Sequence, residues 1–260
     1  MKTDPGWLEV RLAADERDLR AAQRLRYRVF VEELGGDGPL VDHDARLERD
    51  EFDPVVDHLL LVDTRRDPDA GEHVVGAYRL LRSQVAEDFG RYYCDSEYDL
   101  TPLRQSGRRL VELGRSCVDP DYRGGSGMFL LWNALADYVL AHDIEILFGV
   151  ASFHGTRIEP LAQALSWLHH HHLAPAALRP VARAPHYQRM DLIAPEALDR
   201  RAAMTAMPAL IKAYLRLGGV VGDGAWIDHE FNTTDVFLLM DTAAMSERHR
   251  QYYQDRRQGA

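Results

Sequence analysis

A mixed β-sheet flanked by helices is the fold class that the sequence predicts, in the α/β (α+β) range. The main observation is the order of hydrophobic patterns, which runs strand, helix, two strands as a hairpin, strand, helix, strand, helix and late strand. A doubly wound parallel sheet does not begin with such an early antiparallel hairpin. The 260 residues, 46% of them hydrophobic, are enough to build a sizeable core.

The first half of the chain supplies most of the expected strands. Alternating or continuous apolar residues predict strands at residues 7–12, 58–63, 73–82 and 109–118. Apolar residues at three- and four-residue spacing predict a helix over residues 15–34, which the Gly- and Pro-rich residues 35–39 end. Residues 40–53 are acidic and irregular, 65–72 form a polar turn, and 83–107 hold short helices or loops.

The second half is expected to be richer in helices. The helical spacing recurs at residues 128–141, 158–171 and 202–217. An apolar run at 144–151 is typical of a buried strand, and residues 226–240 hold at least one more. We expect one domain over residues 1–245, with a C-terminal extension at about 195–245 and a charged tail at 246–260.

Composition excludes several classes of protein. A net charge of −10 argues against a nucleic-acid partner, whose binding surface is usually basic. Two cysteines, Cys94 and Cys117, are too few for a disulfide framework and indicate a reducing compartment. We find neither a secretory leader nor an apolar run of about 18 residues. The expected location is therefore the cytoplasm.

A Gly-rich basic turn between a predicted strand and a predicted helix is the first candidate site. Its donor-binding candidates are Val118, Arg123, Gly124, Gly125, Ser126 and Gly127. Backbone N–H groups at a helix start hold anions well, and Arg123 would add a positive charge. The alternative is an ordinary strand-to-helix turn in which the glycines only permit tight geometry.

This turn resembles the acyl-donor loop of the GCN5-related N-acetyltransferase (GNAT) superfamily. LRYRVF at residues 25–30, ERDEFD at 48–53 and ELGR at 112–115 occur in the same order in acyl-homoserine-lactone synthases. Further stretches resemble the ornithine N-acyltransferases, sometimes called hemolysin-like: LFGVASFHG at 147–155, ALSWLH at 164–169, PALIKAYLRLG at 208–218 and GDGAWIDHEFNTTDV at 222–236. The resemblance covers roughly residues 7–242.

The resemblance implies a fold, an activity and co-substrates. The fold would be a mostly antiparallel GNAT-like sheet that splays between its two central strands. The activity would move a (3-hydroxy)fatty acyl group from acyl carrier protein to the α-amino group of an amino acid, L-ornithine first, to give lyso-ornithine lipid. No cofactor would stay bound, since the donor is the carrier's phosphopantetheine thioester. A peripheral contact with the inner face of the membrane is a further expectation.

The glycine spacing departs from the common coenzyme A loop, Arg/Gln-x-x-Gly-x-Gly/Ala. Arg123 is followed by Ser126 and Met128 at the two glycine positions. A bulky Met128 obstructs the close backbone approach that a pyrophosphate needs. The spacing therefore favours acyl carrier protein over acyl-CoA, although acyl-CoA stays a candidate donor.

Acyl transfer to an amine needs a base, oxyanion donors and aligned reactants. Glu112 is the first candidate for the base, with Asp50 and Arg115 as further catalytic candidates. The alternative is that Glu112 pairs with Arg115; period-two alternation puts them on opposite faces, and a bulge near Gly114 would bring them together. Backbone N–H groups of residues 117–119 are candidate oxyanion donors.

Three carboxylates, one arginine and one histidine are the candidates for acceptor binding: Glu48, Asp53, Asp228, Arg79 and His229. The acidic residues at 48–53 would hold ammonium groups, and Arg79 and Arg115 would hold a substrate carboxylate. Alternatively, those acidic residues form a solvated loop or pair with the arginines, and Asp228 and His229 have a structural role. Ser152, Phe153 and His154, expected just after a strand, are further donor-binding candidates, with a loop or capping role as the alternative.

Two tempting features carry less weight. Cys117 with His154 as base would allow a covalent acyl-enzyme, but a cysteine in a buried strand is usually a core residue. The His169–His172 run brings only two imidazoles to one helix face, too few for a metal site. No metal is therefore expected. An autoinducer synthase acting on S-adenosylmethionine, or a silent acyl-binding module, remains the competing interpretation of the whole chain.

Overall fold

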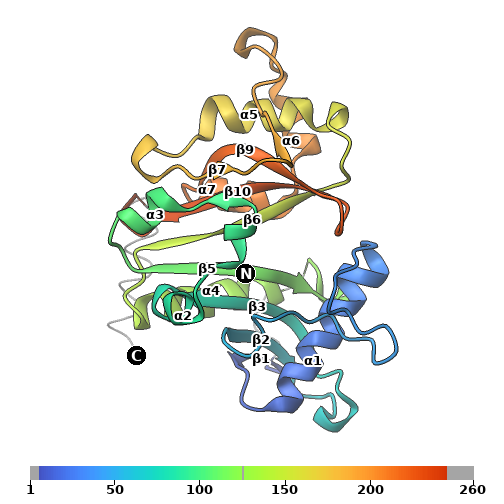
Figure 1. Cartoon of the computed structure of the whole chain (residues 1–260). Coiled ribbons are helices and arrows are strands. Elements are labelled where there is room, and N and C mark those ends of the chain that lie inside the picture. Colours follow the sequence, from blue (N-terminus) through green and yellow to red (C-terminus); the bar gives the residue numbers. More distant parts are fainter. Residues whose placement is uncertain (1–5, 125, 245–260) are drawn as a thin grey trace. The chain divides into compact units, whose positions relative to one another are not determined.

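The computed structural model describes residues 6–124 and 126–244 (Figure 1), so Gly125 and the charged tail lie outside the described residues. These residues divide into two compact units. Unit 1 comprises the described residues up to Gly90 together with Glu112–Asp143, and unit 2 comprises Arg91–Val111 and the described residues from Ile144 onward. Each unit is a set of strands covered by helices.

Unit 1 is built on four neighbouring strands. In sheet order they are β1 (Leu8–Leu12), β2 (Asp57–Asp63), β3 (Val74–Arg82) and β5 (Leu110–Val118), the last of which begins in unit 2. β1 pairs with β2 and β2 with β3, both antiparallel, which confirms the predicted early hairpin. Its helices are α1 (Glu16–Arg26), α2 (Ser83–Phe89) and α4 (Gly127–Ala141).

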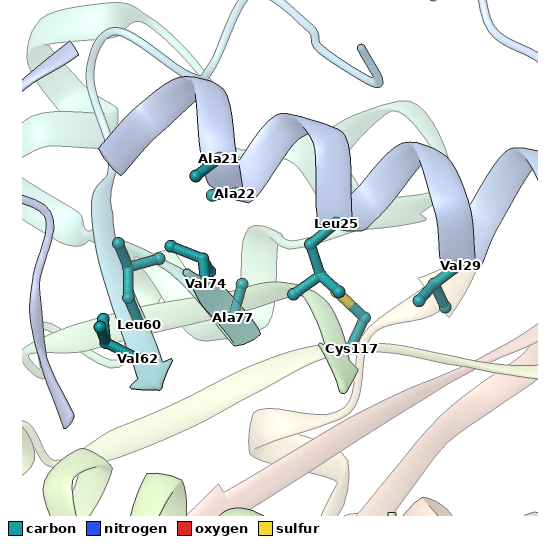
Figure 2. Packing of buried hydrophobic residues seen from close by; sticks show 9 residues of the cluster. All are labelled: Ala21, Ala22, Leu25, Val29, Leu60, Val62, Val74, Ala77 and Cys117. Atoms are coloured by element: carbon teal, nitrogen blue, oxygen red, sulfur yellow. The ribbon is translucent and has the colours of Figure 1, made fainter. Parts of the chain in front are cut away.

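Helices α1 and α4 pack on opposite faces of these strands. Successive strand residues point to opposite sides, so apolar residues on both sides need a helix to cover them. Leu60, Val62 and Ala77 share a buried cluster with α1 (Figure 2). On the other face, a Cβ added to Gly76 would meet Leu131 of α4 and Leu61 at 3.0 Å. α1 itself begins at Asp15, whose side chain accepts hydrogen bonds from the N–H groups of Arg17 and Asp18.

The helix predicted over residues 15–34 has two parts. After α1 the chain continues as a π-helix, η1 (Tyr27–Glu33). Its hydrogen bonds include Leu34 N to Val29 O at 3.2 Å, a five-residue step. Apolar spacing predicts the helix but does not distinguish this wider winding from the α-helical one.

Unit 2 contains a second set of mostly antiparallel strands. Their order is β6 (Ile146–His154), β10 (Thr233–Asp241), β9 (Val220–Asp228), β7 (Val181–Ala182) and β4 (Tyr98–Asp99), with β8 (Tyr187–Gln188) also on β9. Only the β7–β9 pairing among these is parallel. The helices of unit 2 are α3 (Thr101–Gln105), α5 (Ala162–His172), α6 (Arg200–Ala206) and α7 (Ala209–Arg216).

Two expectations for unit 2 are corrected, and a third, for residues 226–240, is confirmed in more detail. The strand predicted at 144–151 continues to His154, so Ser152, Phe153 and His154 lie within β6. The helix predicted at 202–217 is interrupted at Met207 and Pro208, because proline lacks an N–H and disfavours helical geometry in the residue before it. Residues 226–240 belong to two strands, β9 and β10, joined by a turn. Within the described residues, no helix is long and apolar enough to cross a membrane.

Candidate functional site

Arg26 forms the centre of a buried group of charges in unit 1. Its side chain is fully buried and lies on the inner face of α1, four residues after Ala22. The guanidinium donates to Glu48 Oε2 at 2.5 Å and to both oxygens of Asp53 at 2.7 and 2.8 Å. Burial acts to lower the Arg26 pKa, but Glu48 and Asp53 more than offset this, and the pKa is raised.

Arg79 and Arg115 complete the group, which we call the charge network: Arg26, Arg79, Arg115, Glu48, Asp50 and Asp53. Arg79 Nη1 donates to Asp50 at 2.5 Å and to Asp53 at 3.1 Å. Arg115 donates from Nε to Glu48 at 3.0 Å and from Nη2 to Asp50 at 3.4 Å. Three positive charges thus oppose three negative ones.

The network changes the role expected for the acidic segment. Residues 48–53 are not a solvated acidic loop, since the side chains of Glu48 and Asp53 are only 1% and 3% exposed. Their oxygens are engaged by arginines, so in this structure they hold the arginines in place, in contrast to the direct ammonium contact expected from sequence. Asp50, with its side chain 18% exposed, is the carboxylate of the network that solvent reaches.

Arg115, within β5, has a positive φ of 48°, which is unusual for a strand residue. In a regular strand Gly114 and Arg115 would face opposite sides. Here Arg115 reaches Glu48, while a Cβ on Gly114 would lie 3.9 Å from Arg79 Nε. Both residues therefore face the charge network. Glu112, two residues before Gly114 and 4% exposed, shares the face of Gly114.

The segment expected from sequence to bind the acyl donor starts at the end of β5, and we call its described residues, 118–124 and 126–127, the donor loop. Asp119 begins it by accepting a hydrogen bond from Asp121 N, and it pairs with Arg28 at 2.9 Å. The N–H of Asp119 donates to Val75 O at 2.9 Å, so this group is not an oxyanion donor in the structure. That correction removes one of the N–H groups expected in that role.

The predicted anion grip, Arg123, is already occupied by protein groups. Its Nε donates to Val118 O at 2.9 Å, and its Nη1 and Nη2 each donate to Glu33 at 2.6 Å. Gly124 adopts a left-handed φ of 75°, which a glycine reaches without strain. Ser126 lies at the N-cap position of α4 without a side-chain capping hydrogen bond. Gly127 allows close packing, because a Cβ there would lie 2.8 Å from Leu61 Cδ2.

Cys117 is a core residue. It is 5% exposed and lies beside Leu25 in the cluster under α1 (Figure 2). Burial raises the pKa of its thiol to about 12, so the nucleophilic thiolate is scarce at neutral pH. The core interpretation therefore fits, and the covalent acyl-enzyme does not.

The remaining donor candidates lie in unit 2, at the end of β6. Phe153 is 1% exposed and packs in the core of this unit. Ser152 and His154 are exposed and share the opposite side of the strand, paired in register with Asp235 and Thr233 of β10. Phe153 is therefore a core residue, which differs from the donor contact expected of it. Ser152 and His154 are accessible, so donor contact stays a prediction for these two.

Asp228 and His229 form part of the turn between β9 and β10. Asp228 Oδ1 accepts hydrogen bonds from Glu230 N at 2.8 Å and Phe231 N at 2.9 Å. The His229 ring lies edge-on to His186, with 5.4 Å between ring centroids. Asp228 therefore stabilises the turn in this structure, a role that differs from the acceptor binding expected from sequence.

Sequence reasoning assigned no role to three residues that the structure places around the site. Arg26 centres the charge network, and Arg28 and Glu33 bind the donor loop. The sequence does carry a signal for Arg26, because an arginine between Ala22 and Val29 falls on the apolar face of the helix. Arg28 and Glu33 carry no such signal.

Comparisons with known proteins show the family and the fold of the chain. A GNAT acetyltransferase domain model matches residues 25–133. An L-ornithine N(alpha)-acyltransferase of Rhodobacter capsulatus is 68% identical, over 100% of this chain and 99% of that protein. One from Agrobacterium fabrum is 44% identical, over 95% of this chain and 85% of its own length. The solved structure of FeeM, an N-acyl amino acid synthase from uncultured soil microbes, covers 91% of each chain at 14% identity with a TM-score of 0.52, which shows the fold. The chain therefore belongs to the L-ornithine N(alpha)-acyltransferase family, acyltransferases of the GNAT fold.

Proposed function

We propose that this acyltransferase moves a (3-hydroxy)fatty acyl group from acyl carrier protein to the α-amino group of L-ornithine, giving lyso-ornithine lipid. The observation that carries the proposal is strand β5. Arg115 contacts the charge network, Gly114 faces Arg79, and Glu112 lies on the side of Gly114 by strand alternation, just before the donor loop. The names of the relatives support L-ornithine as the acceptor.

In the proposed mechanism Glu112 acts as general base. Ornithine arrives with its α-amino group protonated, and Glu112 accepts one proton to expose the nitrogen lone pair. The nitrogen attacks the thioester carbonyl carbon, so that the N–C bond forms and the C–S bond breaks. The pantetheine sulfur leaves as a thiol after taking a proton, and the product is an amide. No protein group is acylated, in keeping with the raised pKa of Cys117.

The charge network would orient the acceptor. Asp50 is its least buried carboxylate and would hold an ammonium group, while Arg79 and Arg115 both pair with it. A substrate carboxylate would replace Asp50 as the partner of Arg79 or Arg115, so that the guanidinium stays paired with a carboxylate. Glu48 and Asp53 prevent the arginines from rotating away, because both stay buried against Arg26.

The donor loop would take the phosphodiester of the pantetheine arm through Arg123, Gly124 and the start of α4. Met128 at the second glycine position favours a carrier-borne pantetheine over coenzyme A. The proposed place of reaction is the cytoplasm, with the product entering the inner face of the membrane.

The test is lipid mass spectrometry of a host that makes no ornithine lipid, expressing wild type, Glu112→Gln, Asp50→Asn or Asp42→Asn. Asp42 is the matched control, because it also pairs with an arginine, Arg49, but lies outside the charge network. We expect lyso-ornithine lipid from the wild type and Asp42→Asn alone. A lactone made from S-adenosylmethionine, or full activity of Glu112→Gln, would contradict the proposal.

The donor is tested separately with purified protein. Hydroxyacyl carrier protein and the matching acyl-CoA are compared at equal concentrations of ornithine. We expect saturable turnover with the carrier and a much lower kcat/KM with acyl-CoA. Efficient use of short acyl-CoA alone would reject the carrier as donor.

A further inference from the structure

Two ion pairs join the π-helical segment η1 to the donor loop. Arg28 Nη2 lies 2.9 Å from Asp119 Oδ2, at the start of the loop. Glu33 accepts from both Nη1 and Nη2 of Arg123, each at 2.6 Å, further along it. The two pairs have opposite polarity, since η1 contributes the cation of one and the anion of the other.

The π-helical winding accounts for this arrangement. Arg28 and Glu33 are five positions apart, and in an α-helix, at about 100° per residue, they would point about 140° away from each other. In a π-helix the hydrogen bond runs from residue i to residue i+5, so residues five apart lie close together. The Leu34 N to Val29 O bond shows this step within the segment. The winding thus presents both side chains to one loop.

Glu33 holds Arg123 in the way that a phosphate would. A guanidinium offers a planar fork that matches carboxylate and phosphate alike. Glu33 occupies that fork with both oxygens, while Nε keeps the loop closed on Val118 O. The pair is accessible, because the Arg123 and Glu33 side chains are 43% and 37% exposed. An accessible pair exchanges at little cost, unlike the buried Arg26 pairs.

We propose that the Glu33 carboxylate occupies the face of Arg123 that takes the phosphodiester of the acyl donor, and that donor binding exchanges Glu33 for phosphate while Arg28 and Asp119 hold the loop. This inference rests on the proposed function, since it assumes a donor with a phosphodiester at Arg123. Glu33 is then a positioning residue that sets the affinity for the donor. A donor without a phosphate cannot replace Glu33 at Arg123. The exchange therefore selects against such donors.

The test compares Glu33→Gln with Glu32→Gln. Glu32 is a close control: it is the neighbouring residue, loses the same charge, is 39% exposed and pairs with Arg46 instead of the donor loop. We expect Glu33→Gln to lower the KM for acyl carrier protein about threefold to tenfold, since one carboxylate no longer competes for Arg123. The change in donor KM should exceed any change in kcat or in the ornithine KM. Glu32→Gln should match the wild type.

A second variant and a binding measurement complete the test. Arg28→Gln should raise the donor KM, because the start of the loop loses its attachment. Free 4′-phosphopantetheine, titrated calorimetrically, should bind more tightly to Glu33→Gln than to Glu32→Gln. A donor KM and a 4′-phosphopantetheine affinity that are unchanged or weakened in Glu33→Gln would overturn the inference. The wild type could transfer no acyl group from the carrier while Glu33→Gln still binds 4′-phosphopantetheine more tightly than Glu32→Gln. That result would reject acyl carrier protein as the donor but support the exchange at Arg123.

Discussion

Replacing Arg26 with methionine tests the charge network most directly. The guanidinium is fully buried and donates to Glu48, to Asp53 and to the backbone carbonyl of Glu48. The methionine side chain would fill a similar space without charge, and the network would change from three arginines and three carboxylates to two against three. One buried negative charge would then have no cation.

The expected cost is about 3 kcal/mol or more at neutral pH. Removing one partner of a buried ion pair typically costs about 3–5 kcal/mol, because the charge left behind is desolvated. We expect a value near the lower end of this range, since Arg115 still contacts Glu48 and Arg79 still contacts Asp53.

The pH dependence gives a second, independent prediction. In the wild type, burial acts to raise the pKa of Asp53, but hydrogen bonds and attraction from Arg26 and Arg79 hold it well below its usual range. Because the pKa of Asp53 is lower in the folded state, its charge stabilises the fold at pH values above the unfolded pKa, near 4. This stabilisation is lost as the pH falls below that value. In Arg26→Met the surplus carboxylate has a raised pKa, which destabilises at neutral pH and is relieved as the pH falls. The difference between variant and wild type should therefore shrink between pH 7 and pH 5.

The assay is urea unfolding followed by tryptophan fluorescence at both pH values. Arg20→Met is the control on the same helix, because it breaks only the exposed Glu16 pair and should cost at most about 0.5 kcal/mol. A cost below about 1 kcal/mol for Arg26→Met at pH 7, or a difference that grows on acidification, would refute the reasoning.

Three further predictions concern residues around the site and in unit 2. Cys117→Ala should keep kcat within about twofold, because its pKa near 12 leaves little thiolate; a folded variant with lost turnover would implicate the thiol. Gly127→Ala should cost about 1–3 kcal/mol, since its Cβ would lie 2.8 Å from Leu61, and a double-mutant cycle with Leu61→Ala should show a smaller cost. Gly224→Ala should cost at least about 1 kcal/mol, because φ is 78° and the Tyr187 ring lies 2.3 Å from the added Cβ. Tyr187→Ala should remove only the steric part of that cost, as thermal unfolding of the double variant will show.

Local pattern was enough to place most elements. The strands at 58–63, 73–82 and 109–118 and the helix at 128–141 agree with β2, β3, β5 and α4 to within a residue or two. Alternation and helical spacing are properties of neighbouring residues, so a single sequence carries them. The errors fall where local pattern is ambiguous: the π-helical winding of Tyr27–Glu33 and the break before Pro208.

By itself, the sequence determined the family, the fold class and the strand–turn–helix at residues 110–141, because these depend on ordered motifs and on residues close in the chain. Only the tertiary structure decided what the charges do. Glu48 meets Arg26 across 22 positions and Arg115 across 67, and Glu33 meets Arg123 across 90. No periodicity links such partners; folding brings them together, and burial then requires that each charge be paired. An acidic segment that looks solvated in sequence is for this reason a scaffold for three arginines.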